Sequence, residues 1–194
     1  MAIMTTHTLL NQLIGSINQH QARIIDQPTL PQAGVLVAIT NETDPQLVLT
    51  QRARHLSSHS GEVAFAGGKR DETDPDIVYT ALREAHEEIN LPSSHVNVVG
   101  ELDQVVSLFG YLVTPIVGIV PAETEFVANQ DELDAIFKVP LRYFLENEPD
   151  DYMKRGKILI PSYHYEGFRI WGLTAMMITE MMNNHLNANI TIRF

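Results

Sequence analysis

Apolar residues gather in short runs along the chain, and polar turns separate these runs. The segments 34–40 and 46–50 are rich in Val, Leu and Ile, and the polar segment 41–45 lies between them. This pattern predicts a β-hairpin, because branched apolar residues favour strands and Asn, Asp and Pro favour turns. Further strands are expected at 96–106 and 112–120, and a second hairpin at 158–165 and 168–171.

The segment 75–89 has a helical period. Its apolar residues recur at intervals of three and four, which predicts a helix with one face toward a core. The residues expected on that face are Ile77, Val78, Ala81, Leu82, Ala85 and Ile89. The acidic residues Glu84, Glu87 and Glu88 are expected to point elsewhere.

Both ends of this helix are marked in the sequence. Asp74 is expected to cap the first turn, Pro75 to take the first helical position, and Asp76 to complement the positive end of the helix dipole. The stop is expected to combine a left-handed cap, an apolar residue that folds back and a proline. These three residues are Asn90, Leu91 and Pro92.

Two more helices are expected near the ends of the chain, at about 6–22 and at about 173–186. The second has a Met-rich face that is expected to pack in the core or in a homodimer interface. Its methionines are Met176, Met177, Met181 and Met182. The mixture of helices and strands in this order predicts an α/β fold, an α/β/α sandwich with a mixed central sheet.

Composition is typical of one compact domain over residues 1–194, since 44% of the residues are hydrophobic and no Ser-, Gly- or Pro-rich linker divides the chain. The chain has no cysteine, which excludes disulfides and thiolate metal sites, and its N-terminal segment lacks a signal-peptide pattern. We therefore expect a cytoplasmic protein. No run reaches the roughly 18 apolar residues of a membrane span, so no membrane partner is expected.

Three carboxylates of the predicted helix are spaced for metal binding. Glu84, Glu87 and Glu88 stand at i, i+3 and i+4, which places them on one face of one helical turn. Their repulsion would be relieved by a hard divalent cation that shares the oxygens. A solvated acidic surface is the plain alternative. The preceding Gly67 and Gly68 favour the metal site over a solvated surface, because backbone without side chains can approach a phosphate closely.

The charge distribution favours an anionic small molecule. The formal net charge of -11 disfavours nucleic acid as a partner. Five of the 13 basic residues nevertheless gather around the glycine pair and the helix, which predicts a local positive field. They are Arg52, Arg54, Lys69, Arg70 and Arg83.

The segment 68–91 resembles the Nudix box, in which a glycine, an acid, an Arg-Glu pair, a Glu-Glu pair and a final aliphatic residue follow at fixed spacings. The matching residues are Gly68, Arg83, Glu84, Ala85, Glu87, Glu88 and Leu91. Asp74 replaces the usual glutamate, the gap to Arg83 is one residue longer, and Asn90 replaces the closing glycine. The resemblance implies a Nudix-type sandwich and a hydrolase of nucleotide diphosphate derivatives that uses Mg²⁺ or Mn²⁺.

A longer stretch, 48–74, resembles the motif of coenzyme A diphosphatases within the Nudix group. The matching residues are Leu49, Thr50, Arg52, Leu56, His59, Gly61, Val63, Phe65, Gly67, Gly68 and Asp74. The departures are Val48, Ala53, Ser57, Ala66 and Asp71, and Ser57 removes an arginine that could contact phosphate. The resemblance implies cleavage of coenzyme A or acyl-coenzyme A to 3′,5′-ADP and 4′-phosphopantetheine or its acyl form.

These residues receive the following expected roles. Glu84, Glu87 and Glu88 are the metal ligands, and all of their donor atoms are oxygens. Arg83 is expected to hold a neighbouring glutamate bidentately. Glu87 is the favoured general base, and Glu88 and Glu132 are the other candidates. The alternative role of Glu132 is that of a loop acid or a helix cap. The expected substrate-binding residues are Arg52, His59, Gly67, Gly68 and Lys69.

Two alternatives stay open at this point. ADP-ribose, NADH and nucleoside triphosphates contain the same reacting diphosphate, so the box does not separate them from coenzyme A. A domain that senses a nucleotide metabolite without cleaving it belongs to another class of function. The complete set of three glutamates disfavours the sensor, because binding alone needs no metal ligands.

Overall fold

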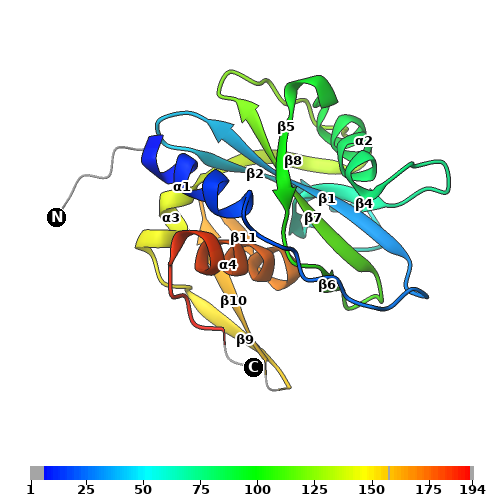
Figure 1. Cartoon of the computed structure of the whole chain (residues 1–194). Coiled ribbons are helices and arrows are strands. Elements are labelled where there is room, and N and C mark those ends of the chain that lie inside the picture. The colour runs from blue at the N-terminus through cyan, green and yellow to red at the C-terminus, as the bar shows by residue number, and fades with distance from the viewer. Residues whose placement is uncertain (1–6, 157, 193–194) are drawn as a thin grey trace.

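The computed structural model describes residues 7–156 and 158–192. Its elements are named as in Figure 1. In chain order they are α1 (His7–Ile17), β1 (Gln32–Asn41), β2 (Gln46–Arg52), β3 (Val63–Ala64), β4 (Ala66–Lys69), α2 (Ile77–Ile89), η1 (Ser93–His95), β5 (Asn97–Glu101), β6 (Val105–Val106), β7 (Leu112–Pro121), β8 (Leu133–Pro140), α3 (Leu141–Glu146), β9 (Asp151–Arg155), β10 (Ile158–Tyr165), β11 (Phe168–Ile170) and α4 (Gly172–Leu186).

A mixed sheet of eight strands lies at the centre. Its main path runs β3-β2-β1-β7-β5, and β8, β4 and β6 pair with β2, β1 and β7. Strands β1 and β7 run parallel, from the pair Gln32 and Leu112 to the pair Asn41 and Pro121. The other pairs of this sheet are antiparallel. A second, three-stranded antiparallel sheet follows the order β11-β10-β9.

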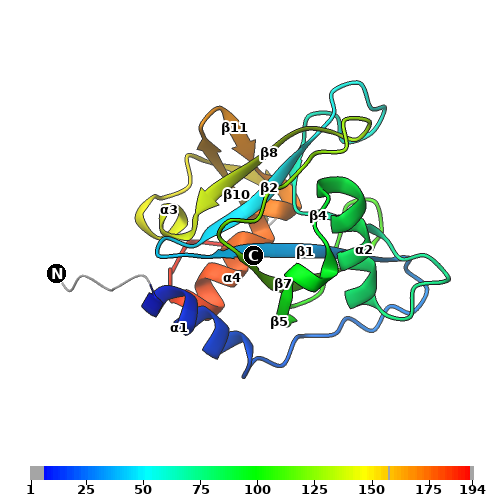
Figure 2. The ribbon, with the colours of Figure 1, turned by 90° about the horizontal axis from the view of Figure 1, so that it is seen from above.

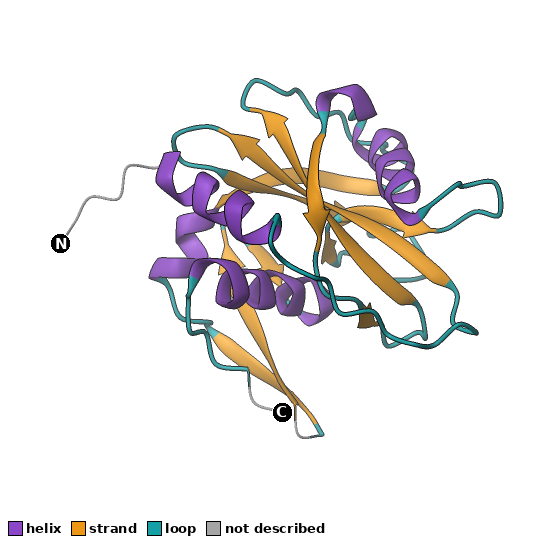
Figure 3. Ribbon diagram, in the orientation of Figure 1, coloured by secondary structure: helices purple, strands orange, loops and turns teal. Residues whose placement is uncertain are grey.

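Helices cover both faces of the central sheet (Figures 2 and 3). Successive side chains of β1 point to opposite faces, as the pleat of a strand requires. Leu36 and Ala38 are buried in the cluster under α2, whereas Val37 and Ile39 belong to the cluster under α1 and α4. Strand β1 is therefore covered on both sides, and the predicted α/β/α sandwich with a mixed sheet is confirmed.

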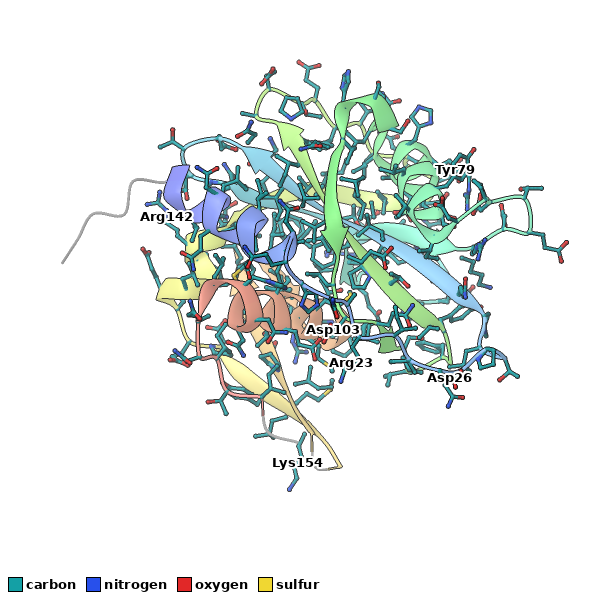
Figure 4. All side chains as sticks on the ribbon, viewed as in Figure 1. Arg23, Asp26, Tyr79, Asp103, Arg142 and Lys154 are labelled. Carbon is teal, nitrogen blue, oxygen red and sulfur yellow. The ribbon has the colours of Figure 1, made fainter. Side chains whose placement is uncertain are left out.

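Helix α2 ends where the sequence predicts but starts at a different cap. Asp76, not Asp74, is the N-cap, and its Oδ1 accepts a hydrogen bond of 2.7 Å from the Tyr79 N–H. Tyr79 is 49% exposed and marks the solvent side of the helix (Figure 4). Asn90 adopts the left-handed conformation at φ 53°, and Leu91 is fully buried. The prediction of Asp74 as the cap is wrong, because Asp74 turns inward instead.

The strand expected at 96–106 is broken into β5 and β6. The break occurs at Asp103, whose Oδ1 lies 2.8 Å from His20 Nε2 and accepts a 2.9 Å hydrogen bond from the Arg23 N–H. Arg23 and Asp103 lie close together in Figure 4. Asp103 thus pairs with the segment after α1 and not with a neighbouring strand.

The terminal helices differ from expectation by a few residues. Helix α1 ends at Ile17, five residues early, and residue 6, where it was expected to begin, lies outside the described residues. Helix α4 begins at Gly172, next to the expected residue 173. Met177, Met181 and Met182 are buried in the core. No helix among residues 7–156 and 158–192 has the length and apolar character that crossing a membrane requires.

Close contact between α2 and β1 depends on Gly34. A Cβ atom at this position would lie 2.7 Å from the Ile77 carbonyl oxygen and 3.0 Å from the Ala81 backbone nitrogen. Both neighbours are backbone atoms, so only movement of the helix could make room. Gly34 thereby sets how near the acidic helix lies to the sheet.

We expect Gly34→Ala to lower the free energy of unfolding by about 1 to 3 kcal/mol, because added volume in a packed interior displaces backbone. Gly15→Ala is the matched control, since a Cβ at Gly15 meets nothing within 4 Å. That change in helix α1 should raise the stability by about 0.5 to 1 kcal/mol. Urea unfolding of both variants measures the difference, and equal effects would contradict this account of Gly34.

Candidate active site

Strand β4 places the glycine pair directly against helix α2. A Cβ atom at Gly68 would overlap the Glu84 carboxylate, so any larger residue would displace this carboxylate from its position. The neighbouring Gly67 N–H donates a hydrogen bond of 3.1 Å to Glu88 Oε2. The glycines therefore position two carboxylates of the helix, in addition to offering the bare backbone that the sequence predicts for a phosphate.

Arg83 is the centre of a network of acceptors. Its Nε and Nη2 donate hydrogen bonds of 3.1 Å to the two carboxylate oxygens of Asp74. Its Nη1 lies 3.0 Å from Glu87 Oε2 and its Nη2 lies 2.9 Å from Glu84 Oε1. Nη2 also donates to the Lys69 carbonyl oxygen at 3.1 Å. The expected bidentate partner of Arg83 was a glutamate, and the structure places Asp74 there.

Asp74 is a buried anion held by several donors. It is 4% exposed, and its Oδ2 also accepts hydrogen bonds from the Asp71 N–H and the Thr80 hydroxyl. The hydrogen bond from Arg83 lowers the pKa of Asp74 to about 2. In turn, Asp74 and the nearby glutamates raise the pKa of the Arg83 guanidinium. This pair is therefore ionised throughout the neutral range.

The three glutamates of the helix occupy different environments. The side chain of Glu87 is 53% exposed, that of Glu84 is 17% exposed and that of Glu88 is 5% exposed. The expectation that all three point away from the interior is wrong for Glu88. Glu88 stands in the last turn of α2, beside the glycine strand β4. Its side chain is almost completely buried there.

Burial raises the pKa of Glu88 to about 7, although the Gly67 N–H and Arg52 oppose the shift. Burial also raises the pKa of Glu84 against the effect of Arg83. The negative charge of Glu132 raises the pKa of both groups further. Glu132 therefore lies near the helix carboxylates, even though 44 residues separate it from Glu88 in the sequence.

The loop before β8 brings Glu132 to this position. Asn129 donates a backbone hydrogen bond of 2.8 Å to the Glu88 carbonyl oxygen, and its side-chain amide lies 3.3 Å from Glu132 Oε1. The Glu132 carbonyl oxygen accepts a 2.8 Å hydrogen bond from Ala53. The loop is thus anchored both to α2 and to the end of β2.

The carboxylates do not form a ready metal site by themselves. In the described part of the chain, no three His, Cys, Asp or Glu side chains are arranged to hold a metal ion. Glu84 and Glu87 contact Arg83 instead, and Glu88 contacts Arg52 and a backbone N–H. Their oxygens and their mutual repulsion nevertheless suit a hard divalent cation. A cation at this position would compete with Arg83 and Arg52 for these oxygens.

A cleft of about 600 Å³ adjoins the glycine strand. All five residues that the sequence predicts for substrate binding line this cleft, namely Arg52, His59, Gly67, Gly68 and Lys69. Its volume falls within the range of about 300 to 1,000 Å³ that is usual for small-molecule sites. Arg52 also reaches the carboxylates, since its Nη1 lies 3.6 Å from Glu88 Oε1. The cleft and the acidic helix therefore meet at Arg52 and Gly67.

Two aromatic residues of the cleft were missed by the sequence reasoning. The Phe109 ring packs edge-on against the His59 ring with centroids 4.6 Å apart. The Lys69 Nζ lies 5.1 Å from the centre of the Tyr111 ring, and a hydrogen bond to Tyr111 raises the pKa of Lys69. The sequence feature that could have identified them is a pair of aromatic residues in the short turn between two strands.

Fewer of the five predicted basic residues line the cleft than the sequence suggests. Arg54 is largely exposed and its Nε lies 3.8 Å from Asp134, whereas Arg70 bonds to Gln32 and to backbone carbonyl oxygens near Asp74. Neither residue lines the cleft. Arg52 and Lys69 are left as the basic side chains in its wall.

Comparison with known proteins identifies the fold family. Residues 30–155 match the model of the NUDIX domain. The protein named uncharacterized Nudix hydrolase NudL from Escherichia fergusonii is 44% identical over 154 residues, which cover 77% of this chain and 80% of that protein.

Solved structures agree at the level of the fold. The Nudix hydrolase RenU from M. smegmatis has a TM-score of 0.53 at 19% identity and covers 83% of this chain and 88% of its own. The Ap4A hydrolase from C. elegans, solved as a binary complex, has a TM-score of 0.50 at 15% identity and covers 59% of this chain and 84% of its own. The structures show the fold, whereas the matched domain and the sequence identity to NudL show that the chain belongs to the Nudix hydrolase family.

Proposed function

We propose that this Nudix hydrolase cleaves the diphosphate of coenzyme A or acyl-coenzyme A, releasing 3′,5′-ADP and 4′-phosphopantetheine or its acyl form. The observation that carries the proposal is the junction of the cleft with the carboxylates of α2 at Arg52 and Gly67. Coenzyme A is chosen because the residues that resemble the coenzyme A diphosphatase motif include Arg52 and His59, which line this cleft. We place the reaction in the cytoplasm.

Glu84, Glu87 and Glu88 are the proposed ligands of Mg²⁺ or Mn²⁺. A bound divalent cation would neutralise charge on the diphosphate and lower the pKa of a water molecule for attack. Glu87 could turn toward such a cation because its side chain is half exposed, and it would then exchange its 3.0 Å contact with Arg83 Nη1 for the cation. Glu88 would gain most, because a cation would offset the burial that raises its pKa to about 7.

Glu87 is also the proposed general base, and Glu132 is the second candidate. The exposed carboxylate of Glu87 lies at the open end of the cluster, where an attacking water can reach it. Glu132 approaches Glu84 and Glu88 from the opposite loop. Arg83 acts as a positioning residue, since it holds Asp74 on one side and two glutamates on the other.

Arg52 and Lys69 are the proposed diphosphate contacts. Both are basic side chains in the wall of the cleft, and hydrogen bonds from cations to phosphate oxygens are among the strongest in proteins. His59 is the proposed third contact, with its ring held between Glu62 and Phe109. Gly67 and Gly68 would bring backbone close to the same group.

We expect the purified protein to release 3′,5′-ADP from coenzyme A when Mg²⁺ is added, and to lose this activity in EDTA. Liquid chromatography of a substrate panel with coenzyme A, ADP-ribose, NADH and nucleoside triphosphates measures the release. Cleavage of another panel member with coenzyme A inert would overturn the substrate and keep the hydrolase. If one nucleotide binds but nothing is cleaved, a sensor of nucleotide metabolites replaces the enzyme.

Replacement of either glutamate of the pair, by Glu87→Gln or Glu88→Gln, is expected to lower kcat by about 10²- to 10⁴-fold, the range for loss of a catalytic acid or base. Glu88→Gln should be no less stable than the wild type at pH 8, because it removes a buried negative charge and still accepts from Gly67. The matched control is Glu72→Gln, an exposed acid in the neighbouring loop. It should keep full activity, and an equal loss there would refute the assignment.

The Asp74 and Arg83 pair predicts a specific dependence of stability on pH. Asp74→Asn should lower the free energy of unfolding by about 2 kcal/mol at pH 7, as expected for a hydrogen-bonded charge pair. The pKa of Asp74 falls from 3.8 to about 2 on folding. Its charge therefore stabilises the fold above about pH 4, and this contribution disappears as pH falls toward 2.

Urea unfolding between pH 7 and pH 2.5 tests this dependence. The difference between wild type and Asp74→Asn should be constant down to about pH 4 and then shrink. Asp71→Asn is the control, because Asp71 is 66% exposed and lies 3.8 Å from the same guanidinium. Exposed pairs contribute about 0 to 1 kcal/mol. A deficit in Asp74→Asn that stays unchanged at pH 2.5 would contradict the assigned pKa.

A further inference from the structure

A second hollow adjoins the cleft across the turn between β6 and β7. It has a volume of about 300 Å³, and Ser107 lines both spaces. Phe109 of the same turn lines the cleft, whereas Leu108 lines the second space. We call this second space the apolar hollow. The turn at 107–110 is thus a shared wall between the cleft and the apolar hollow.

The wall of the apolar hollow consists mainly of apolar side chains from four places in the chain. Val106 and Leu108 come from β6 and the turn, Met153 and Ile160 from β9 and β10, and Trp171 and Met176 from the start of α4. None of the residues that line it carries a charge. A ligand in this space therefore meets few polar groups, unlike one in the cleft beside Arg52 and Lys69.

The turn exposes an unusual amount of apolar surface. Among the described residues, seven large hydrophobic side chains are exposed, and three of them stand together here. Val106 is 45% exposed, Leu108 is 63% exposed and Phe109 is 67% exposed. A contiguous apolar surface beside a ligand cleft is typical of a binding site, because exposure to water is unfavourable without a partner.

We propose that the apolar hollow is a subsite for a straight hydrocarbon chain carried by the substrate, so that acyl-coenzyme A is preferred over free coenzyme A. This inference rests on the proposed function for the polar half of the substrate. Ser107 lines both spaces, so a molecule bound in the cleft would reach the hollow by passing over this residue. The hollow holds about ten times the roughly 30 Å³ that a water molecule occupies in the liquid, which is room for several methylene groups.

The preference can be measured with coenzyme A and its straight-chain acyl thioesters from acetyl to octanoyl. We expect kcat/KM to rise by about fourfold per methylene group while the chain enters the hollow, as hydrocarbon transfer from water predicts. Leu108→Asp places a charge in the wall and should reduce the ratio of octanoyl to free coenzyme A by at least tenfold. Ile24→Asp is the matched control, because Ile24 is 66% exposed and lines neither space.

Binding can be followed without catalysis, because Trp171 is the single tryptophan of the chain. In EDTA, octanoyl-coenzyme A should change the fluorescence of the wild type and of Ile24→Asp, and should leave Leu108→Asp unchanged. Free coenzyme A should leave all three unchanged. This measurement reports on the hollow whether or not the diphosphate is cleaved.

The outcomes separate the two proposals. If free coenzyme A is cleaved and chain length has no effect on kcat/KM, the subsite is overturned and the proposed function stands. If no coenzyme A derivative is cleaved, the proposed function fails, and the subsite survives only if octanoyl-coenzyme A still changes Trp171 fluorescence in the expected variants. A fluorescence change that follows protein concentration and not the acyl chain would assign the patch to self-association and overturn the subsite.

Discussion

The guanidinium of Arg83 is the interaction on which the rest of the site depends. It joins Asp74 from the loop, Glu84 and Glu87 from the helix and the carbonyl oxygen of Lys69 from the glycine strand. One planar cation therefore fixes three segments of the chain relative to one another. A lysine could not replace it, because a single ammonium lacks the forked geometry that meets both oxygens of Asp74. The ion pair thus joins two residues that stand nine positions apart in the sequence.

This arrangement holds several carboxylates that repel one another close to the cleft. Glu88 is buried with a pKa of about 7, and Glu132 and Glu84 oppose its ionisation further. Such a cluster costs stability in the absence of a cation and becomes favourable when one binds. Arg83 and Arg52 compensate part of the repulsion in the protein alone. The same charges that repel one another in the protein alone are therefore the ones suited to chemistry on a dense anion.

The parts of the fold that the sequence predicts correctly are those set by local chemistry. Asn90 is left-handed and Leu91 is buried because the end of a helix follows from neighbouring residues alone. The helix start was misassigned because Asp74 and Asp76 are both good caps, and only the distant Arg83 decides which of them turns inward. The break at Asp103 likewise depends on His20 and Arg23, which no local pattern connects to it.

The site shows the same division between local and distant signals. The motif residues predict which side chains face the cleft, but the acceptors of Arg83, the burial of Glu88 and the approach of Glu132 follow from strand pairing and loop anchoring. The carboxylates lie on α2 and on the loops before α2 and β8, whereas Leu108, Phe109 and Tyr111 belong to the turn between β6 and β7. Because different segments supply the carboxylates and the apolar walls, substitutions in that turn can alter which substrate binds without disturbing the carboxylates. The glycine strand and Arg52 are the points that both functions share, so a substitution there is expected to affect binding and chemistry together.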